Sequence, residues 1–112
     1  MVIETLKVQL NPSEVDRYIR CDTDIWTPVL EQCAGFAGKE VWWDLTGEVM
    51  IVVRWASREE WKSIDEGILE ETERAFVTAF GRSVPFLEER AYFQGFHCEA
   101  PSGAPSNSSV TP

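Results

Sequence analysis

The sequence has one histidine, His97, and three cysteines, and this scarcity narrows the chemistry open to the chain. His97 lies beside the C-terminal tail, so neither a histidine-based triad nor a multi-histidine metal site can form. Cys21, Cys33 and Cys98 lack the Cys-x-x-Cys spacing of zinc sites and thioredoxin-like motifs. No glycine-rich phosphate loop is present. We therefore expect no metal and no cofactor.

Basic residues are also scarce. The chain has 10 lysines and arginines against 19 acids, which gives a net charge of -9. Clustered Lys and Arg hold phosphate backbones and anionic lipid, so we expect neither nucleic acid nor a membrane surface as a partner. No apolar run approaches the ~20 residues that span a bilayer, and residues 1–10 do not resemble a secretory signal. The sequence predicts a cytoplasmic protein.

The remaining composition is that of one globular domain. The chain has 112 residues, 44% of them hydrophobic, and five tryptophans. From Gly95 onward the sequence becomes rich in Pro, Gly and Ser and loses all periodicity. We predict a folded domain over residues 1–94 and a disordered polar tail over residues 95–112.

The N-terminal half predicts a strand, a helix and a hairpin. Residues 2–10 alternate as a strand, and Asn11 can cap the helix that follows. Pro28 is expected to kink that helix or make it restart near Thr27, before it ends at residues 34–35. Residues 37–44 and 48–55 read as a hairpin with a three-residue loop. That loop would place one apolar set on a single face: Val41, Trp43, Val49, Ile51, Val53 and Trp55.

The C-terminal half predicts two helices and a strand. Ser57 can cap a short helix, and Asp65 can cap a longer one that ends near Gly81. Residues 84–94 read as a last strand. The order β-α-β-β-α-β is that of an α+β, ferredoxin-like split βαβ fold, with a four-stranded antiparallel sheet and helices on one face.

The second face of the hairpin is too apolar to be left bare. It carries Trp42, Met50 and Val52, with Arg54 among them. A second copy of the sheet is a good candidate to cover it, so we predict a homodimer through these residues. Arg54 has two interpretations, an anchor for an anionic ligand or an ion pair with Glu4, Glu40 or Glu88.

Asp22 is the candidate acid or base. It lies four residues after Tyr18 and four before Trp26, on or beside the buried stripe of the helix. A carboxylate among aromatic side chains has its charged form disfavoured, which is one route to proton transfer. The alternative is that Asp22 lies at the edge of the buried stripe and bonds to Arg, Lys or backbone.

The candidates for the wall of a ligand pocket are Trp26, Trp55, Trp61 and Tyr92, with core packing as the alternative role for each.

Three segments carry a resemblance to a known family: Asp22-Thr23-Asp24-Ile25-Trp26-Thr27-Pro28, Gly35-Phe36-Ala37-Gly38-Lys39-Glu40-Val41-Trp42, and Arg54-Trp55-Ala56-Ser57-Arg58-Glu59-Glu60-Trp61-Lys62. The chain resembles an uncharacterised cyanobacterial family of the dimeric α/β-barrel superfamily, which includes the antibiotic-biosynthesis monooxygenases. The resemblance implies two sheets packed face to face in a dimer, and no established activity. Haem-degrading relatives use a helical histidine, and residues 66–80 contain none.

These observations lead to two hypotheses of different kinds. The first is a dimeric domain that binds a small apolar or aromatic molecule, with cofactor-independent monooxygenase-like or isomerase-like chemistry at Asp22. The alternative is a non-catalytic dimerisation or regulatory protein-interaction module, in which the tryptophans only pack.

Overall fold

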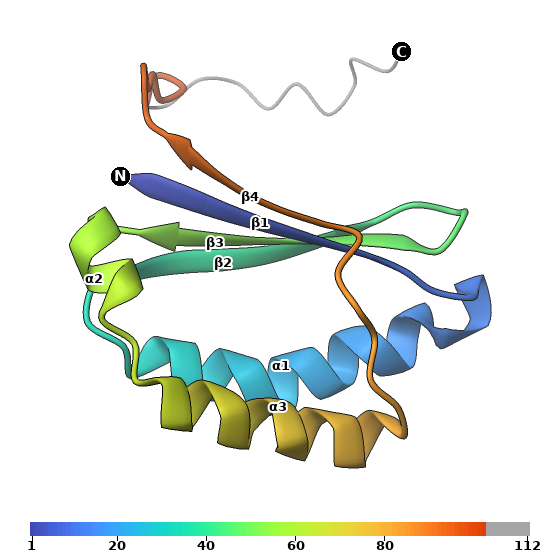
Figure 1. Ribbon diagram of the computed structural model, residues 1–112. Helices are drawn as coiled ribbons and strands as arrows, with labels where there is room; N and C mark the ends of the chain where they lie inside the picture. Colours follow the sequence, from blue (N-terminus) through green and yellow to red (C-terminus); the bar gives the residue numbers. More distant parts are fainter. Residues whose placement is uncertain (103–112) are drawn as a thin grey trace.

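The computed structural model describes residues 1–102 and places two long helices against one face of a sheet (Figure 1). The strand order β2-β3-β1-β4 is antiparallel throughout, which confirms the expected four-stranded ferredoxin-like fold. In chain order the elements are β1 (Val2–Gln9), the short 3-10 helix η1 (Pro12–Glu14), α1 (Val15–Glu31), β2 (Phe36–Trp43), β3 (Glu48–Trp55), α2 (Arg58–Lys62), α3 (Glu66–Phe80) and β4 (Glu88–Phe93).

The β2–β3 hairpin has the expected three-residue loop. Val41 lies opposite Ile51 and Trp43 opposite Val49, and the Asp44 N–H donates to the Glu48 carbonyl over 3.0 Å. The register puts one face of β3 toward the helices and leaves the other, which we call the outer face, uncovered. The outer face includes Trp42, Met50, Val52 and Arg54.

The core lies between the sheet and the helices. Trp55, Phe80, Val8, Val49 and Val53 are its most deeply buried large side chains. Burial of a tryptophan such as Trp55 contributes about 4–6 kcal/mol before entropy costs are subtracted. This core packs the sheet against the start of α1 and the end of α3.

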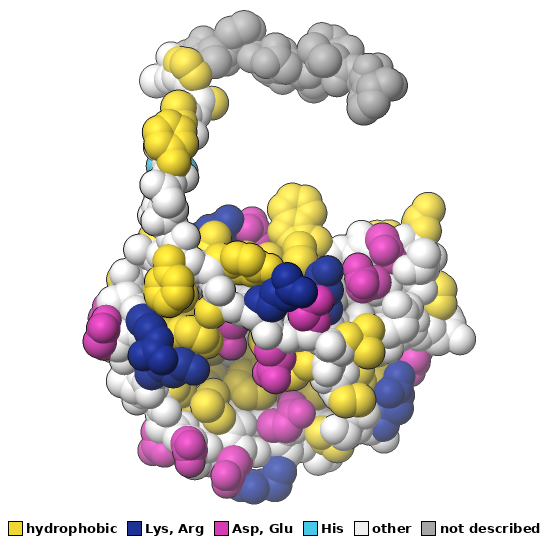
Figure 2. Space-filling view, turned by 45° about the horizontal axis from the view of Figure 1, so that its top comes forward, with side chains coloured by type: hydrophobic (Ala, Val, Ile, Leu, Met, Phe, Trp, Pro, Cys, Tyr) yellow, Lys and Arg dark blue, Asp and Glu magenta, His cyan; other side chains and the backbone are white. Residues whose placement is uncertain are grey.

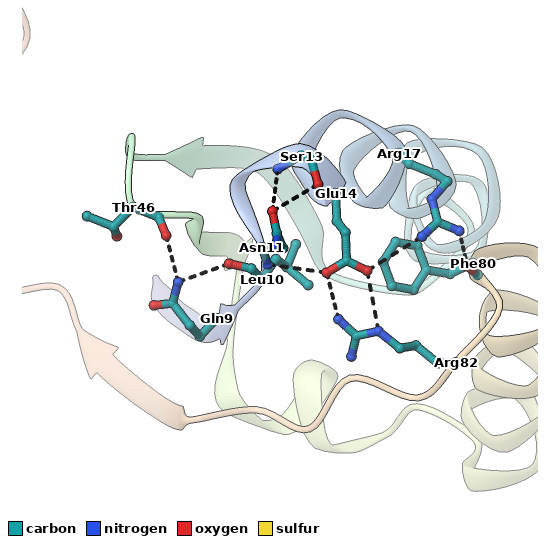
Figure 3. Close-up of polar contacts among 9 residues, drawn as sticks. All are labelled: Gln9, Leu10, Asn11, Ser13, Glu14, Arg17, Thr46, Phe80 and Arg82. Atoms are coloured by element: carbon teal, nitrogen blue, oxygen red, sulfur yellow. Dashed lines mark hydrogen bonds and ion pairs between the residues drawn. The ribbon is translucent and has the colours of Figure 1, made fainter.

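A polar cluster joins the start of α1 to the end of α3 (Figure 3). Asn11 accepts from the Ser13 N–H over 3.0 Å and its own N–H donates to Glu14, which is the expected cap. Glu14 also pairs with Arg82 over 2.9 Å. Arg17 donates to the Phe80 carbonyl at the C-terminus of α3. The cluster therefore holds the two helices together at one end.

Two element boundaries differ from the sequence-based expectation. Pro28 lies inside α1, and the helix continues to Glu31, so the expected restart near Thr27 is wrong. Proline in the last turn leaves only one carbonyl, that of Asp24, without its helical donor, and Asp24 is exposed to water. The last strand begins at Glu88, not at residue 84, because the segment before it contains Pro85, which cannot donate to a sheet ladder.

The chain leaves the sheet after Phe93. The Gln94 N–H donates to the Met1 carbonyl over 3.1 Å, and residues 95–102 then run away from the helices without a strand or helix (Figure 1). The rest of the expected tail, residues 103–112, lies outside the described residues. None of the helices in residues 1–102 is long and apolar enough to cross a membrane.

Candidate ligand-binding cavity

A cavity of about 1040 Å³ lies between the inner face of the sheet and helices α1 and α3. Its volume is at the upper end of the range for small-molecule sites, about 300–1,000 Å³. Figure 2 shows the hollow, with hydrophobic side chains in its depth and acidic side chains around them. The aromatic part of the wall consists of Tyr18, Trp26, Trp55, Trp61 and Phe86. The cavity can therefore surround an aromatic ring on several sides.

Asp22 and Lys39 form a buried ion pair in the cavity wall. The Lys39 Nζ lies 2.5 Å from the Asp22 Oδ2 and also donates to the Thr27 Oγ1 over 3.0 Å. The two side chains are only 6% and 4% exposed for Lys39 and Asp22. Burial raises the pKa of Asp22, and the neighbouring Lys39 ammonium opposes that rise. At this distance we assign the pair as carboxylate and ammonium.

Lys39 lies on the cavity side because it alternates with Val41 along β2 and pairs with Val53. A β-bulge just before it returns Phe36 to the same inner face. Phe36 pairs with Trp55 and Gly38 with Arg54, so the register shifts between residues 36 and 38. Gly38 has a φ of 148°, a conformation that L side chains rarely adopt. The sequence analysis missed Lys39 as a site residue, and its alternation with Val41 along the strand was the signal that could have found it.

Glu4 is a second cavity carboxylate that the sequence analysis did not assign to the site. It shares the inner face of β1 with Leu6, and the Trp55 Nε1 donates to its Oε1 over 3.2 Å. Burial raises the pKa of Glu4, and hydrogen bonds from Trp55 and Trp61 partly offset the rise. Glu4 was considered only as a partner of Arg54, which lies on the opposite face of the sheet.

Glu73 brings a third carboxylate from α3 toward the cavity. Its side chain is half-buried, and burial raises its pKa while a hydrogen bond from Trp26 lowers it.

At the mouth of the cavity, the Lys62 Nζ lies 4.0 Å from the centre of the Trp61 ring. The lining carries six acids, Glu4, Asp22, Glu66, Glu70, Glu73 and Glu89, against four bases, Lys39, Lys62, Arg74 and Arg90.

The structure brings together four of the five residues expected at a ligand pocket. Asp22, Trp26, Trp55 and Trp61 all line the cavity. Tyr92 does not: it pairs with Ile3 on the outer face of the sheet and is 48% exposed. Side chains alternate along a strand, so its neighbour Ala91 faces the cavity instead.

The residues expected at a dimer interface all lie on the outer face. Trp42 is 58% exposed, Met50 is half-buried and Val52 is buried. Arg54 forms an ion pair with Glu40 on the neighbouring strand over 2.6 Å. Trp43, expected in the apolar set of the hairpin, is on the inner side but 55% exposed, because it is the last residue of β2 beside the loop.

Comparison with protein-family models finds no match, and comparison with curated protein sequences finds none either. Solved structures do match. A monooxygenase from the gene ActVA-Orf6 of Streptomyces coelicolor, in complex with the ligand nanaomycin D, is 15% identical with a TM-score of 0.65, over 90% of this chain and 92% of that chain. SnoaB, a cofactor-independent oxygenase from Streptomyces nogalater, is 12% identical with a TM-score of 0.55, over 86% of this chain and 92% of that chain.

A third match concerns assembly. A dimeric ferredoxin-like protein from an uncultured marine organism is 11% identical with a TM-score of 0.59, over 88% of this chain and 92% of that chain. At such identities the likeness concerns the fold. The chain therefore has the ferredoxin-like fold that these solved structures share.

Proposed function

We propose that this chain is a cytoplasmic homodimer that binds a small apolar or aromatic molecule in the cavity. The observation that carries the proposal is the cavity of about 1040 Å³ with aromatic walls and a buried Asp22–Lys39 pair in its lining. Apolar walls with a few placed polar groups are typical of small-molecule sites. The fold shared with a ligand-bound monooxygenase supports the same conclusion by analogy.

The pair suits removal of a proton from the ligand. Asp22 is the acid or base of the proposal: its carboxylate accepts a proton from an acidic C–H or O–H group of the bound molecule. The Lys39 ammonium, 2.5 Å away, then stabilises the anion left on the ligand. In an isomerase, Asp22 returns the proton to a different atom of the same molecule.

The oxygenase route needs molecular oxygen as the co-substrate and oxidant. The deprotonated ligand reduces O₂, one oxygen atom replaces the two hydrogens of a methylene group as a carbonyl, and the other leaves as water. This balance, CH₂ + O₂ → C=O + H₂O, consumes no other reductant. The role of this chain's residues is to hold the ring, take the proton at Asp22 and exclude water.

The outer face is the proposed dimer interface. Trp42, Met50 and Val52 lie there beside the Arg54–Glu40 pair. A two-fold contact through this face would cover the exposed Trp42 and leave the cavity mouths of both copies free, because the cavities lie on the opposite side of each sheet.

Ligand binding and oxygen uptake test the proposal together. Purified protein is titrated with a panel of polycyclic phenols while tryptophan fluorescence and dissolved oxygen are recorded. The proposal predicts saturable quenching, and turnover of at least one phenol that falls at least about 100-fold in Asp22→Asn, a loss typical of an acid or base. Asp16→Asn, an exposed carboxylate of the same helix, is the matched control.

A specific observation also favours the non-catalytic alternative. The Asp22 carboxylate already has an ammonium partner and is only 3% exposed, as a structural pair would be. In that module the cavity would hold a ligand without converting it, or would hold none. Quenching without turnover for every phenol in the panel would favour this module. If the panel produces no quenching and no turnover, the small-molecule function is rejected altogether.

A further inference from the structure

Glu4 and Glu73 are two cavity carboxylates without a cation of their own. Among residues 1–102 no Lys or Arg nitrogen lies within 4.0 Å of either carboxylate. Of the four lining cations, Lys39 pairs with Asp22 and Arg90 with Glu88, whereas Lys62 and Arg74 make no ion pair within that distance in the described part of the chain. A half-buried carboxylate is costly unless it is paired, so each has capacity for a positively charged partner.

Each of these carboxylates is held beside a tryptophan. Trp55 donates to Glu4 over 3.2 Å, and Trp26 lines the cavity beside Glu73, close enough to lower the pKa of that carboxyl. The bond from Trp55 orients Glu4, and both carboxylates keep oxygen lone pairs that can accept from a ligand. A carboxylate beside an aromatic face is the combination that binds a protonated amine, because both groups attract a cation.

The wall already accommodates one ammonium group. The Nζ of Lys62 lies over the Trp61 ring, 4.0 Å from its centre, at the mouth of the cavity. Lys62 is exposed, and its charge lowers the pKa of Glu4 from beyond ion-pair distance, so it is a competitor for that carboxylate but not a bonded partner. It shows the type of contact that a ligand's amino group would make, and it would compete with that group.

We infer that the ligand of this cavity is an alkylamine that carries an aromatic ring, with the ring held among Trp26, Trp55 and Trp61 and the protonated amino group held by Glu4 or Glu73. The inference rests on the proposed small-molecule function and adds the charge of the ligand to it. Anionic ligands of the same size would be disfavoured, because six acids of the lining face four bases.

Three probes with one carbon skeleton separate charge from shape: 4-phenylbutylamine, 4-phenylbutan-1-ol and 4-phenylbutyrate. Their affinities for the full chain are measured by calorimetry at pH 7. The amine is expected to bind at least about tenfold more tightly than the alcohol, as one charge-assisted hydrogen bond allows, and the carboxylate more weakly than the alcohol.

Variants locate the preference. In Glu4→Gln or Glu73→Gln the ratio of amine to alcohol affinity is expected to fall toward one, whereas Glu59→Gln, an exposed carboxylate on α2, keeps the ratio. Lys62→Met is expected to raise the affinity for the amine by removing the competing ammonium. Two glutamate variants are used so that a folding defect in one does not decide the result.

The outcomes distinguish the two levels of the proposal. Similar affinities for all three probes, or a preference that survives both glutamate variants, would overturn the amine inference and leave small-molecule binding intact. Absence of binding by all three probes and by the polycyclic phenols would overturn both.

Discussion

Lys39 and Asp22 join β2 to α1 across the cavity wall, with 2.5 Å between Nζ and Oδ2. The alternation of side chains along β2 brings the lysine to the inner face, and the helical stripe brings the aspartate to meet it. Both side chains are almost completely buried. The pair therefore sets the spacing between sheet and helix at the site, whatever chemistry follows.

Breaking this pair should destabilise the protein strongly. Lys39→Met leaves a buried carboxylate without its cation, and we expect a loss of about 3–5 kcal/mol in the free energy of unfolding. The double variant Lys39→Met with Asp22→Leu should recover most of that loss, because it buries no charge. Urea denaturation of the two single variants and the double variant measures the coupling, and strictly additive losses would contradict a buried pair.

The pKa of Glu4 gives a pH dependence with a defined sign. Burial raises this pKa above its ordinary value of 4.5, so the folded state binds the proton more tightly than the unfolded chain. The stability linked to the bound proton is present below pH 4.5 and is lost as pH rises through the folded pKa. Glu4→Gln should therefore gain stability relative to wild type as pH rises from 4 to 7. An unchanged difference across that range would show that Glu4 is not desolvated.

The two adjacent tryptophans Trp42 and Trp43 provide a matched test of the dimer. They are similarly exposed, at 58% and 55%, but lie on opposite faces of β2. Trp42→Glu should convert the dimer into a monomer, because it puts a charge on the proposed interface, whereas Trp43→Glu should leave the dimer intact. Sedimentation velocity at micromolar concentration measures both, and a wild-type monomer would reject the interface.

Much of the fold was predictable from local patterns. The alternation along β3, the Asp65 cap and Gly81 each fix an element without help from the rest of the chain. The expected helix restart at Pro28 was wrong because the destabilisation caused by a proline depends on its distance from the end of the helix. The sequence pattern placed that end three residues too late. The late start of β4 had a local signal in Pro85, through which the sequence analysis wrongly extended the strand.

The site was less predictable than the fold. Asp22 and its neighbouring tryptophans follow from helical and strand spacing. The partner of Asp22 was overlooked. Alternation puts Lys39 on the same face as Val41, but no local pattern reports that this part of β2 lies against Asp22 of α1. Tyr92 was misplaced because β4 has both faces polar or mixed, and its register came only from pairing with β1.

The cluster in Figure 3 predicts a smaller effect on stability. Arg17 donates to the Phe80 carbonyl, and its guanidinium carbon lies 4.3 Å from the centre of the Phe80 ring. Arg17→Met keeps the aliphatic part and removes the charge, so we expect a loss of about 1 kcal/mol. Arg20→Met, at an exposed residue of the same helix, is the control. Equal losses of unfolding free energy in the two variants would contradict a specific interaction between Arg17 and Phe80.

Ligand binding inside the cavity can be observed directly through the indole N–H groups. The chain has five tryptophans; Trp26, Trp55 and Trp61 line the cavity, while Trp42 and Trp43 lie outside it. Titration of ¹⁵N-labelled protein with 1-naphthol, with each indole signal assigned by a Trp→Phe variant, measures which side chains sense the ring. Saturable shifts at Trp26, Trp55 and Trp61 with Trp42 and Trp43 unmoved are the predicted result. Shifts confined to Trp42 and Trp43, or none at saturating naphthol, would contradict a ligand site between the sheet and the helices.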